Sequence, residues 1–282
     1  MANTKKTTSK GLPKVASNPE SIRVVPLYNP KPEMKLSDLA KGKADSELFG
    51  SDTGVFAAIP KLVYNGGPLI KNVKVFTIFW GKDWKSNASF IALKDKINKF
   101  FTDILTSQVI DQLSEYNRPG SPIGHGSLSG TAIITAGAPT KSIHDSKVQS
   151  TLLSWITAGT VAVWNADTLY FIYMDKGVKV IMGGGASCTS FCGYHNDIKG
   201  KNYYAVMPFP TCAGCLGNAN VFDALTGTSS HELCEAITDP VPPTGWYDNA
   251  NGEIGDICAW KFKNVAGYNV QLEWSNKAKA CV

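Results

Sequence analysis

All seven cysteines of this chain of 282 residues lie in about its last hundred residues. Such crowding favours a framework of local disulfides that ties loops together, and it implies an oxidising compartment. Lysines near the N-terminus are followed by no apolar stretch, so no signal peptide is visible. The cysteines are Cys188, Cys192, Cys212, Cys215, Cys234, Cys258 and Cys281.

Cys212 and Cys215 form a C-x-x-C string. No helix signature follows, because Gly217 comes two residues later, and we therefore expect a structural disulfide rather than a redox centre. Together with Cys188 and Cys192, the same pair also matches a four-thiolate zinc site, which we retain as the alternative.

The three remaining cysteines divide into a pair and a single thiol. Cys258 and Cys281 are candidates for a disulfide that ties down the last strand. Cys234 lies in a helical pattern and is then the odd thiol, which we expect to be buried.

Residues 1–55 are rich in Lys, Ser, Pro and Gly and predict a flexible polar leader or docking arm. From residue 56 to 282 the apolar density is steady, which predicts a single domain. The net charge of +5 comes partly from lysines of the leader, so we expect no nucleic-acid partner. No apolar run approaches the roughly 20 residues that cross a bilayer, so we expect no membrane span. If this leader docks on a second copy of the chain, the protein forms a homo-oligomer.

Apolar periodicity predicts strands and helices in alternation along the domain. The helix that begins near Phe90 has Ser86 and Asn87 as capping candidates. A late helix ends at Asp239, because Pro240 follows. The predicted strands are 73–80, 129–135, 168–174, 178–182, 203–207 and 270–274, the last with one exposed face, and the predicted helices are 90–104, 145–157 and 221–238. We therefore predict an α+β fold: a single zincin-like domain with a mixed sheet backed by helices, and a disulfide-rich C-terminal third.

The late helix carries an H-E-x-x-E string at His231, Glu232 and Glu235. Residues four apart share one face of a helix, so His231 and Glu235 can hold one divalent ion, while Glu232 can contact the water bound to that ion. A carboxylate here replaces the second imidazole of the common H-E-x-x-H peptidase pattern. Glu253 and Asp256 follow at distances that let the chain return to the helix, and either can supply a third ligand.

Zinc bound at such a site lowers the pKa of its water to about 7, and Glu232 can then act as the catalytic base in peptide-bond hydrolysis. A set of one imidazole and two or three carboxylates is harder than the usual zinc ligands, so calcium or manganese is the alternative metal.

Three further residues are candidates for a substrate cleft. Trp246 and Tyr247 either line a cleft beside the metal or pack against the proline-rich loop that precedes them. His195, which we expect in the cysteine-rich loop, either approaches the metal, polarises a substrate or is satisfied by loop backbone.

Several segments of the C-terminal region are similar to those of one known family. The strings Ser-His-Glu-Leu at 230–233, Thr-Asp-Pro at 238–240, Gly-Trp-Tyr at 245–247 and Glu-Ile-Gly-Asp-Ile-Cys at 253–258 resemble the signature of the exordium-like, or phosphate-induced, protein family. The resemblance covers roughly residues 70–282. It implies disulfides, an extracellular or cell-surface location, and a common site formed by His231, Glu232, Glu235 and the segment from Glu253 to Asp256.

The sequence thus predicts a zinc-dependent peptidase that acts on a peptide or protein. The alternative is a non-catalytic secreted or surface protein of the exordium-like family, with a structural metal site and a capacity to self-assemble.

Overall fold

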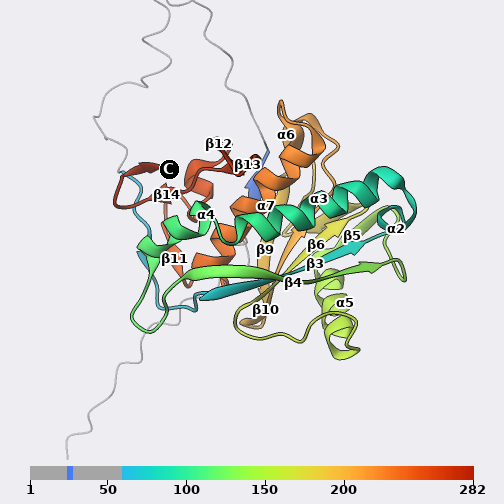
Figure 1. The fold of residues 1–282 in the computed structure, drawn as a ribbon, viewed down its shortest axis with the longest axis horizontal. Coiled ribbons are helices and arrows are strands. Elements are labelled where there is room, and N and C mark those ends of the chain that lie inside the picture. The colour runs from blue at the N-terminus through green and yellow to red at the C-terminus, as the bar shows by residue number, and fades with distance from the viewer. Residues whose placement is uncertain (1–23, 28–58) are drawn as a thin grey trace, which may run out of the picture.

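The structure, a computed structural model, describes residues 24–27 and 59–282. Apart from 24–27, the predicted leader lies outside the described residues. The described chain forms a mixed sheet of six strands with helices on both faces (Figure 1). In spatial order the strands are β1 (Val24–Pro26), β9 (Phe191–Ile198), β10 (Lys201–Met207), β6 (Thr168–Met174), β3 (Asn72–Trp80) and β4 (Gly124–Ile134).

The sheet is parallel over most of its width and antiparallel at one edge. Strands β10, β6, β3 and β4 run parallel to one another, whereas β9 is antiparallel to β10 and β1 is antiparallel to β9. The pairing of Val24 with Tyr194 brings part of the predicted leader onto the edge strand of its own chain. The expected mixed sheet is therefore confirmed.

Successive residues of the central strands point to opposite faces, which divides the core into two layers. Val75 and Phe79 of β3 pack on the side of α3 (Ala88–Ile104) and α7 (Val221–Thr238). Ile78 and Trp80 pack on the opposite side, against α5 (Asp145–Thr157). Figure 1 shows α3 and α7 above the sheet and α5 below it.

The long helices agree with the sequence pattern. Helices α5 and α7 have the predicted bounds, and α3 begins after Asn87, whose side chain accepts a hydrogen bond from the Ser89 backbone N–H. The short helical segments are α2 (Asp83–Ser86), α4 (Gln108–Asp111), α6 (Ala213–Leu216), η1 (Gln112–Tyr116) and η2 (Asp256–Cys258).

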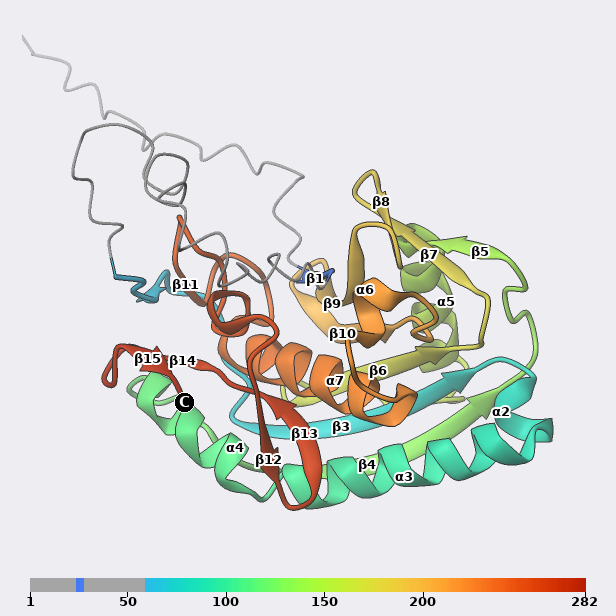
Figure 2. The same ribbon diagram turned by 90° about the horizontal axis from the view of Figure 1, so that it is seen from above.

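Helix α7 lies inside the molecule rather than on its surface. From Ala224 to Thr238 every residue is buried, because the sheet covers one side and the hairpin of β12 and β13 covers another (Figure 2). The smaller sheets consist of β2 (Val63–Tyr64) with β11 (Trp246–Tyr247), β12 (Phe262–Val265) with β13 (Tyr268–Gln271), β14 (Trp274–Ser275) with β15 (Ala280–Cys281), and β5 (Ser142–His144) with β7 (Lys179–Met182) and β8 (Gly185–Ala186).

Two predictions about strands were wrong. The segment 270–274 is not one strand with an exposed polar face, since β13 ends at Gln271 and both Gln271 and Glu273 are only 1% exposed. The cysteine-rich loop expected around His195 is largely the strand β9, which forms because its backbone pairs with β10 on one side and β1 on the other. None of the helices in the described part of the chain is long and apolar enough to cross a bilayer.

Candidate metal centre

Helix α7 determines where the H-E-x-x-E side chains lie. The Asn220 side chain caps its first turn by accepting from the Asp223 N–H, and the helix continues unbroken to Thr238. His231 and Glu235 therefore lie one above the other on one face, as expected for residues four apart. His231, Glu232 and Glu235 are all 0% exposed, so these polar groups are inside the protein and must be compensated there.

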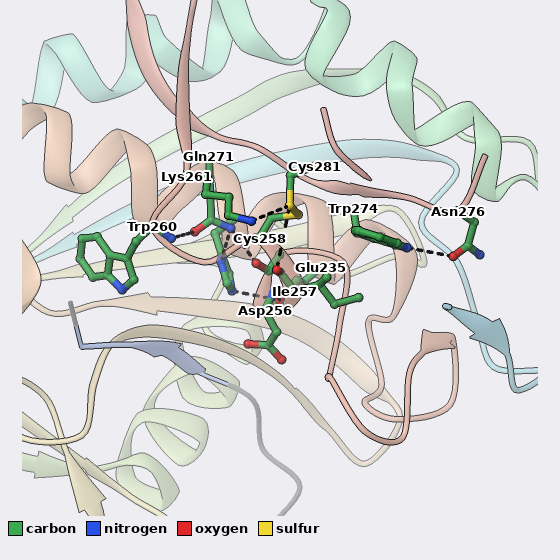
Figure 3. Close-up of a disulfide and its surroundings, with 12 residues drawn as sticks. Glu235, Asp256, Ile257, Cys258, Trp260, Lys261, Gln271, Trp274, Asn276 and Cys281 are labelled. Carbon is green, nitrogen blue, oxygen red and sulfur yellow. Dashed lines mark hydrogen bonds and ion pairs between the residues drawn. A yellow bond between two sulfur atoms is a disulfide. The ribbon is translucent and has the colours of Figure 1, made fainter. Parts of the chain in front are cut away.

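His231, Glu235 and Asp256 form the first group of ligand atoms. His231 Nε2 lies 2.9 Å from Glu235 Oε1, and the Asp256 backbone N–H donates to the same oxygen at 3.0 Å. One ligand atom from each of the three residues lies within 4.8 Å of the others, and Asp256 is half-buried. Figure 3 shows Asp256 and Glu235 together beside the turn that carries Cys258. The structure thus brings together three of the predicted ligands.

Gln271 of β13 fixes the orientation of the His231 ring. Its amide Nε2 lies 2.7 Å from His231 Nδ1 and donates to the Gly255 carbonyl at 2.9 Å. The Gln271 backbone N–H donates to Ser230 Oγ at 2.9 Å, so the strand is also attached to α7 directly. Because Gln271 occupies the Nδ1 side, Nε2 is the nitrogen of His231 that faces the acids.

His195 enters the same cluster from β9. Nδ1 lies 3.0 Å from Glu232 Oε2 and 3.6 Å from Glu235 Oε2, and Nε2 lies 3.2 Å from the Asp239 carbonyl oxygen. Burial alone lowers the pKa of His195, but the hydrogen bond to Glu232 and the nearby carboxylate charges outweigh it, so the pKa is raised. His195 is 1% exposed and lies beside the metal ligands rather than in an open cleft.

Glu253, in the turn before η2, completes a second group of ligand atoms with His195 and Glu235, again within 4.8 Å of one another. Its Oε1 lies 3.6 Å from His195 Nε2. Burial raises the pKa of Glu253 well above its ordinary value, and the charges of Glu235 and Asp239 add to the effect. Burial likewise raises the pKa of Asp239 to about 7. Without a cation, these carboxyl groups resist ionisation.

Several buried carboxylate oxygens have no hydrogen-bond partner among the described residues. In this cluster they are Glu232 Oε1, Glu235 Oε2, Asp239 Oδ2 and both oxygens of Glu253; outside the two ligand groups, Asp175 Oδ1 and both oxygens of Glu273 also lack partners. Buried polar atoms without partners are costly, and oxygens that converge with imidazole nitrogens are the donors that divalent metals use in proteins. The donor set therefore fits a metal ion.

Trp246 and Tyr247 lie on β11, directly after Gly245, whose backbone N–H donates to Asp239 Oδ1 at 2.6 Å. The Trp246 ring packs 5.6 Å from that of Tyr64 and 5.2 Å from that of Tyr116, and its indole N–H donates to the Tyr116 carbonyl. Tyr247 is 5% exposed. Both residues stabilise the packing of β2 and β11 in this structure.

The cysteines form three disulfides in the C-terminal region. Cys258 pairs with Cys281, as predicted, and Cys234 is a buried free thiol. Cys212 and Cys215 do not pair with each other. They pair across to Cys188 and Cys192, respectively, which engages all four thiols and leaves no four-thiolate zinc site among them.

Sequence reasoning missed the roles of Gln271 and Asp239. The alternation of polar and apolar residues around Gln271 predicted an exposed side chain, and Asp239 was interpreted only as the end of a helix. A glutamine that orients a buried histidine has no signal in a single sequence.

Comparison of the chain with protein-family models gives no match, and comparison with curated proteins gives none either.

Proposed function

We propose that this protein binds a divalent metal at His231, Glu235 and Asp256 and hydrolyses peptide bonds with Glu232 as the base. The observation that carries the proposal is the convergence of these three ligands, inside 4.8 Å, around the turn of α7 that also bears Glu232. Catalytic zinc sites use three protein ligands and leave one position for water. One imidazole and two carboxylates satisfy that requirement.

Bound zinc would supply Lewis acidity and activate a water molecule near neutral pH. Glu232 is suited to receive the proton, because burial raises its pKa while its Oε1 remains without a hydrogen-bond partner among the described residues. In the reaction, the water oxygen forms a bond to the peptide carbonyl carbon and the C–N bond breaks. Glu232 delivers the proton to the departing amine.

His195 would hold Glu232 in position by its contact with Oε2, which leaves Oε1 free to accept a proton. Gln271 would hold His231 in the orientation that metal binding requires. Both are positioning residues.

Asp256 is the partly exposed member of the ligand group, so a substrate would approach from its side. Strand β1 also contacts η2 and α7 there, and in Figure 3 it is the blue strand beneath Asp256. Gln271, whose amide contacts His231, also lines a cavity of about 290 Å³ together with Val25, Trp260 and Phe262, among others. The aromatic wall of this cavity suits an apolar side chain of a peptide.

Membership of the exordium-like family and a zincin-like arrangement of sheet and helix are part of this proposal. They are supported by the H-E-x-x-E helix and by the return of Glu253 and Asp256 to it. The three disulfides fit an extracellular or cell-surface protein.

A second function is favoured by one specific observation. His231, Glu232, Glu235 and Glu253 are each 0% exposed, which suits a closed structural site. In this case the metal, zinc or calcium, stabilises a non-catalytic secreted protein.

The test combines metal analysis with a peptide-cleavage assay on the full chain, purified without a chelator or a histidine tag. About one or more equivalents of zinc, lost in His231→Ala, together with cleavage of a mixed peptide library, supports the peptidase. Metal that is lost in His231→Ala without any cleavage supports the structural site. Absence of metal at His231 rejects both.

A further inference from the structure

The carboxylate of Glu235 faces two histidines from different elements. Its Oε1 lies 2.9 Å from Nε2 of His231 on the same helix, and its Oε2 lies 3.6 Å from Nδ1 of His195 on β9. A carboxylate whose two oxygens point to different nitrogen donors can bridge two cations.

Each histidine also has an acid of its own. Asp256 completes the group of His231 and Glu235, and Glu253 completes the group of His195 and Glu235. Both oxygens of Glu253 and Oε2 of Glu235 lack hydrogen-bond partners among the described residues, and both residues are 0% exposed. The second group therefore contains buried oxygen donors that the first group leaves unused.

The surroundings of His195 suit a ligand. Its Nδ1 faces Glu232 Oε2 and its Nε2 faces the carbonyl oxygen of Asp239. Whichever nitrogen binds a cation, the other has an acceptor for its proton, which is the arrangement that orients metal-bound histidines.

The balance of charge points in the same direction. The carboxylates of Glu232, Glu235, Asp239, Glu253 and Asp256 converge here, and all except Asp256 are 0% exposed. When all five of these carboxyl groups are ionised, one divalent cation leaves three negative charges unmatched and two divalent cations leave one. Unmatched buried charge is strongly unfavourable.

We propose that this cluster binds two divalent cations bridged by Glu235, the first held by His231 and Asp256 and the second by His195 and Glu253. The mixture of imidazole and carboxylate ligands suits zinc or manganese. Paired cations in proteins lie about 3.5–4 Å apart, a spacing that one carboxylate spans. The inference rests on the proposed metal site at His231 but not on peptide hydrolysis.

The test is metal stoichiometry on the full chain, treated with chelator and then titrated with zinc or manganese chloride. Wild type should bind two equivalents. Glu253→Gln and Asp256→Asn should each bind one, because each removes a ligand from a different cation. Glu235→Gln should lower the affinity for both cations by at least tenfold. Glu273→Gln is the matched control, since Glu273 is equally buried, at 1% exposure, but belongs to neither group, and it should retain two equivalents.

Electron paramagnetic resonance of the manganese-loaded wild type gives a readout that depends on no variant. Two cations bridged by a carboxylate should give the signal of an exchange-coupled pair. One equivalent with an isolated-ion signal would overturn the inference, as would two equivalents unchanged in Glu253→Gln and Asp256→Asn. If wild type binds one equivalent and Asp256→Asn binds none, the proposed metal site at His231 stands and only the second cation is rejected. Failure of the second cation is therefore distinguishable from failure of the first.

Discussion

Gly255 lies directly against the imidazole ring of His231. A methyl group on Gly255 would come within 2.8 Å of His231 Nδ1 and within 2.9 Å of two ring carbons, well inside the 3.5–4.0 Å of favourable contact. The turn that carries Glu253 and Asp256 therefore approaches α7 closely only because residue 255 has no side chain.

We expect Gly255→Ala to displace the His231 ring or push the turn outward, which separates His231 from Asp256. The affinity for zinc should fall by at least tenfold, measured by calorimetric titration of the chelator-treated protein. Gly214→Ala is the control, because the three atoms nearest to its added methyl group all belong to the Leu27 side chain, the nearest at 3.2 Å. Equal zinc affinity in Gly255→Ala and wild type would show that this close approach is not needed for the metal site.

Gln271→Leu should weaken metal binding without unfolding the protein. The substitution keeps the volume of the side chain but removes the amide that contacts His231 Nδ1 and the Gly255 carbonyl. Loss of a group that orients a metal ligand costs about 10–100-fold in affinity, which titration with zinc measures. Asn269→Ala, on the same strand, removes a hydrogen bond to the Asp223 carbonyl of α7 but no contact to His231, and it should bind zinc like wild type.

The sequence predicted the parts of the fold that local pattern determines. The C-terminal end of α7 was predictable because Pro240 disfavours a helical residue at Asp239. The sequence separation of Asp256 from Glu235 was enough to predict that this acid can return to the helix, and the convergence of His231, Glu235 and Asp256 follows from that return.

Strand β9 was not predictable in this way, because Cys192 and Gly193 give it the composition of a loop and its strand conformation comes from pairing with β10. The contribution of His195 to the cluster depends on that pairing. The buried position of Gln271 likewise depends on the turn after η2 and on the packing of β13 against α7. Such long-range packing cannot be predicted from the local alternation of polar and apolar residues.

The disulfide between Cys258 and Cys281 should stabilise both the fold and the metal site. Cys258 lies in η2, two residues after Asp256, so the bond restrains the turn that supplies this ligand. Replacing both cysteines with serine should lower the free energy of unfolding by about 2–4 kcal/mol, measured by denaturant titration. It should also weaken zinc binding.

The disulfide between Cys188 and Cys212 is the matched control. Its partners are 24 residues apart, against 23 for Cys258 and Cys281, so the two bonds should restrict the unfolded chain almost equally. Removing it should give a similar loss of stability but no loss of zinc affinity. Equal losses of zinc affinity in the two double variants would mean that Cys258 acts on the metal site only through global stability.

Glu232→Gln separates catalysis from metal binding most directly. The amide keeps the shape of the side chain, but it cannot accept the proton from water, so kcat for peptide cleavage should fall by about 10²–10⁴-fold. Zinc content should remain that of wild type, because Glu232 belongs to neither group of ligand atoms within 4.8 Å. His195→Gln provides the comparison, since it removes the group that holds Glu232 Oε2 at 3.0 Å but leaves the proton acceptor itself, and its loss of kcat should be smaller. Unlike Glu232→Gln, it also removes a ligand of the proposed second cation, so it should bind one equivalent of zinc fewer than wild type. Unchanged kcat in Glu232→Gln, with zinc still bound, would reject Glu232 as the base.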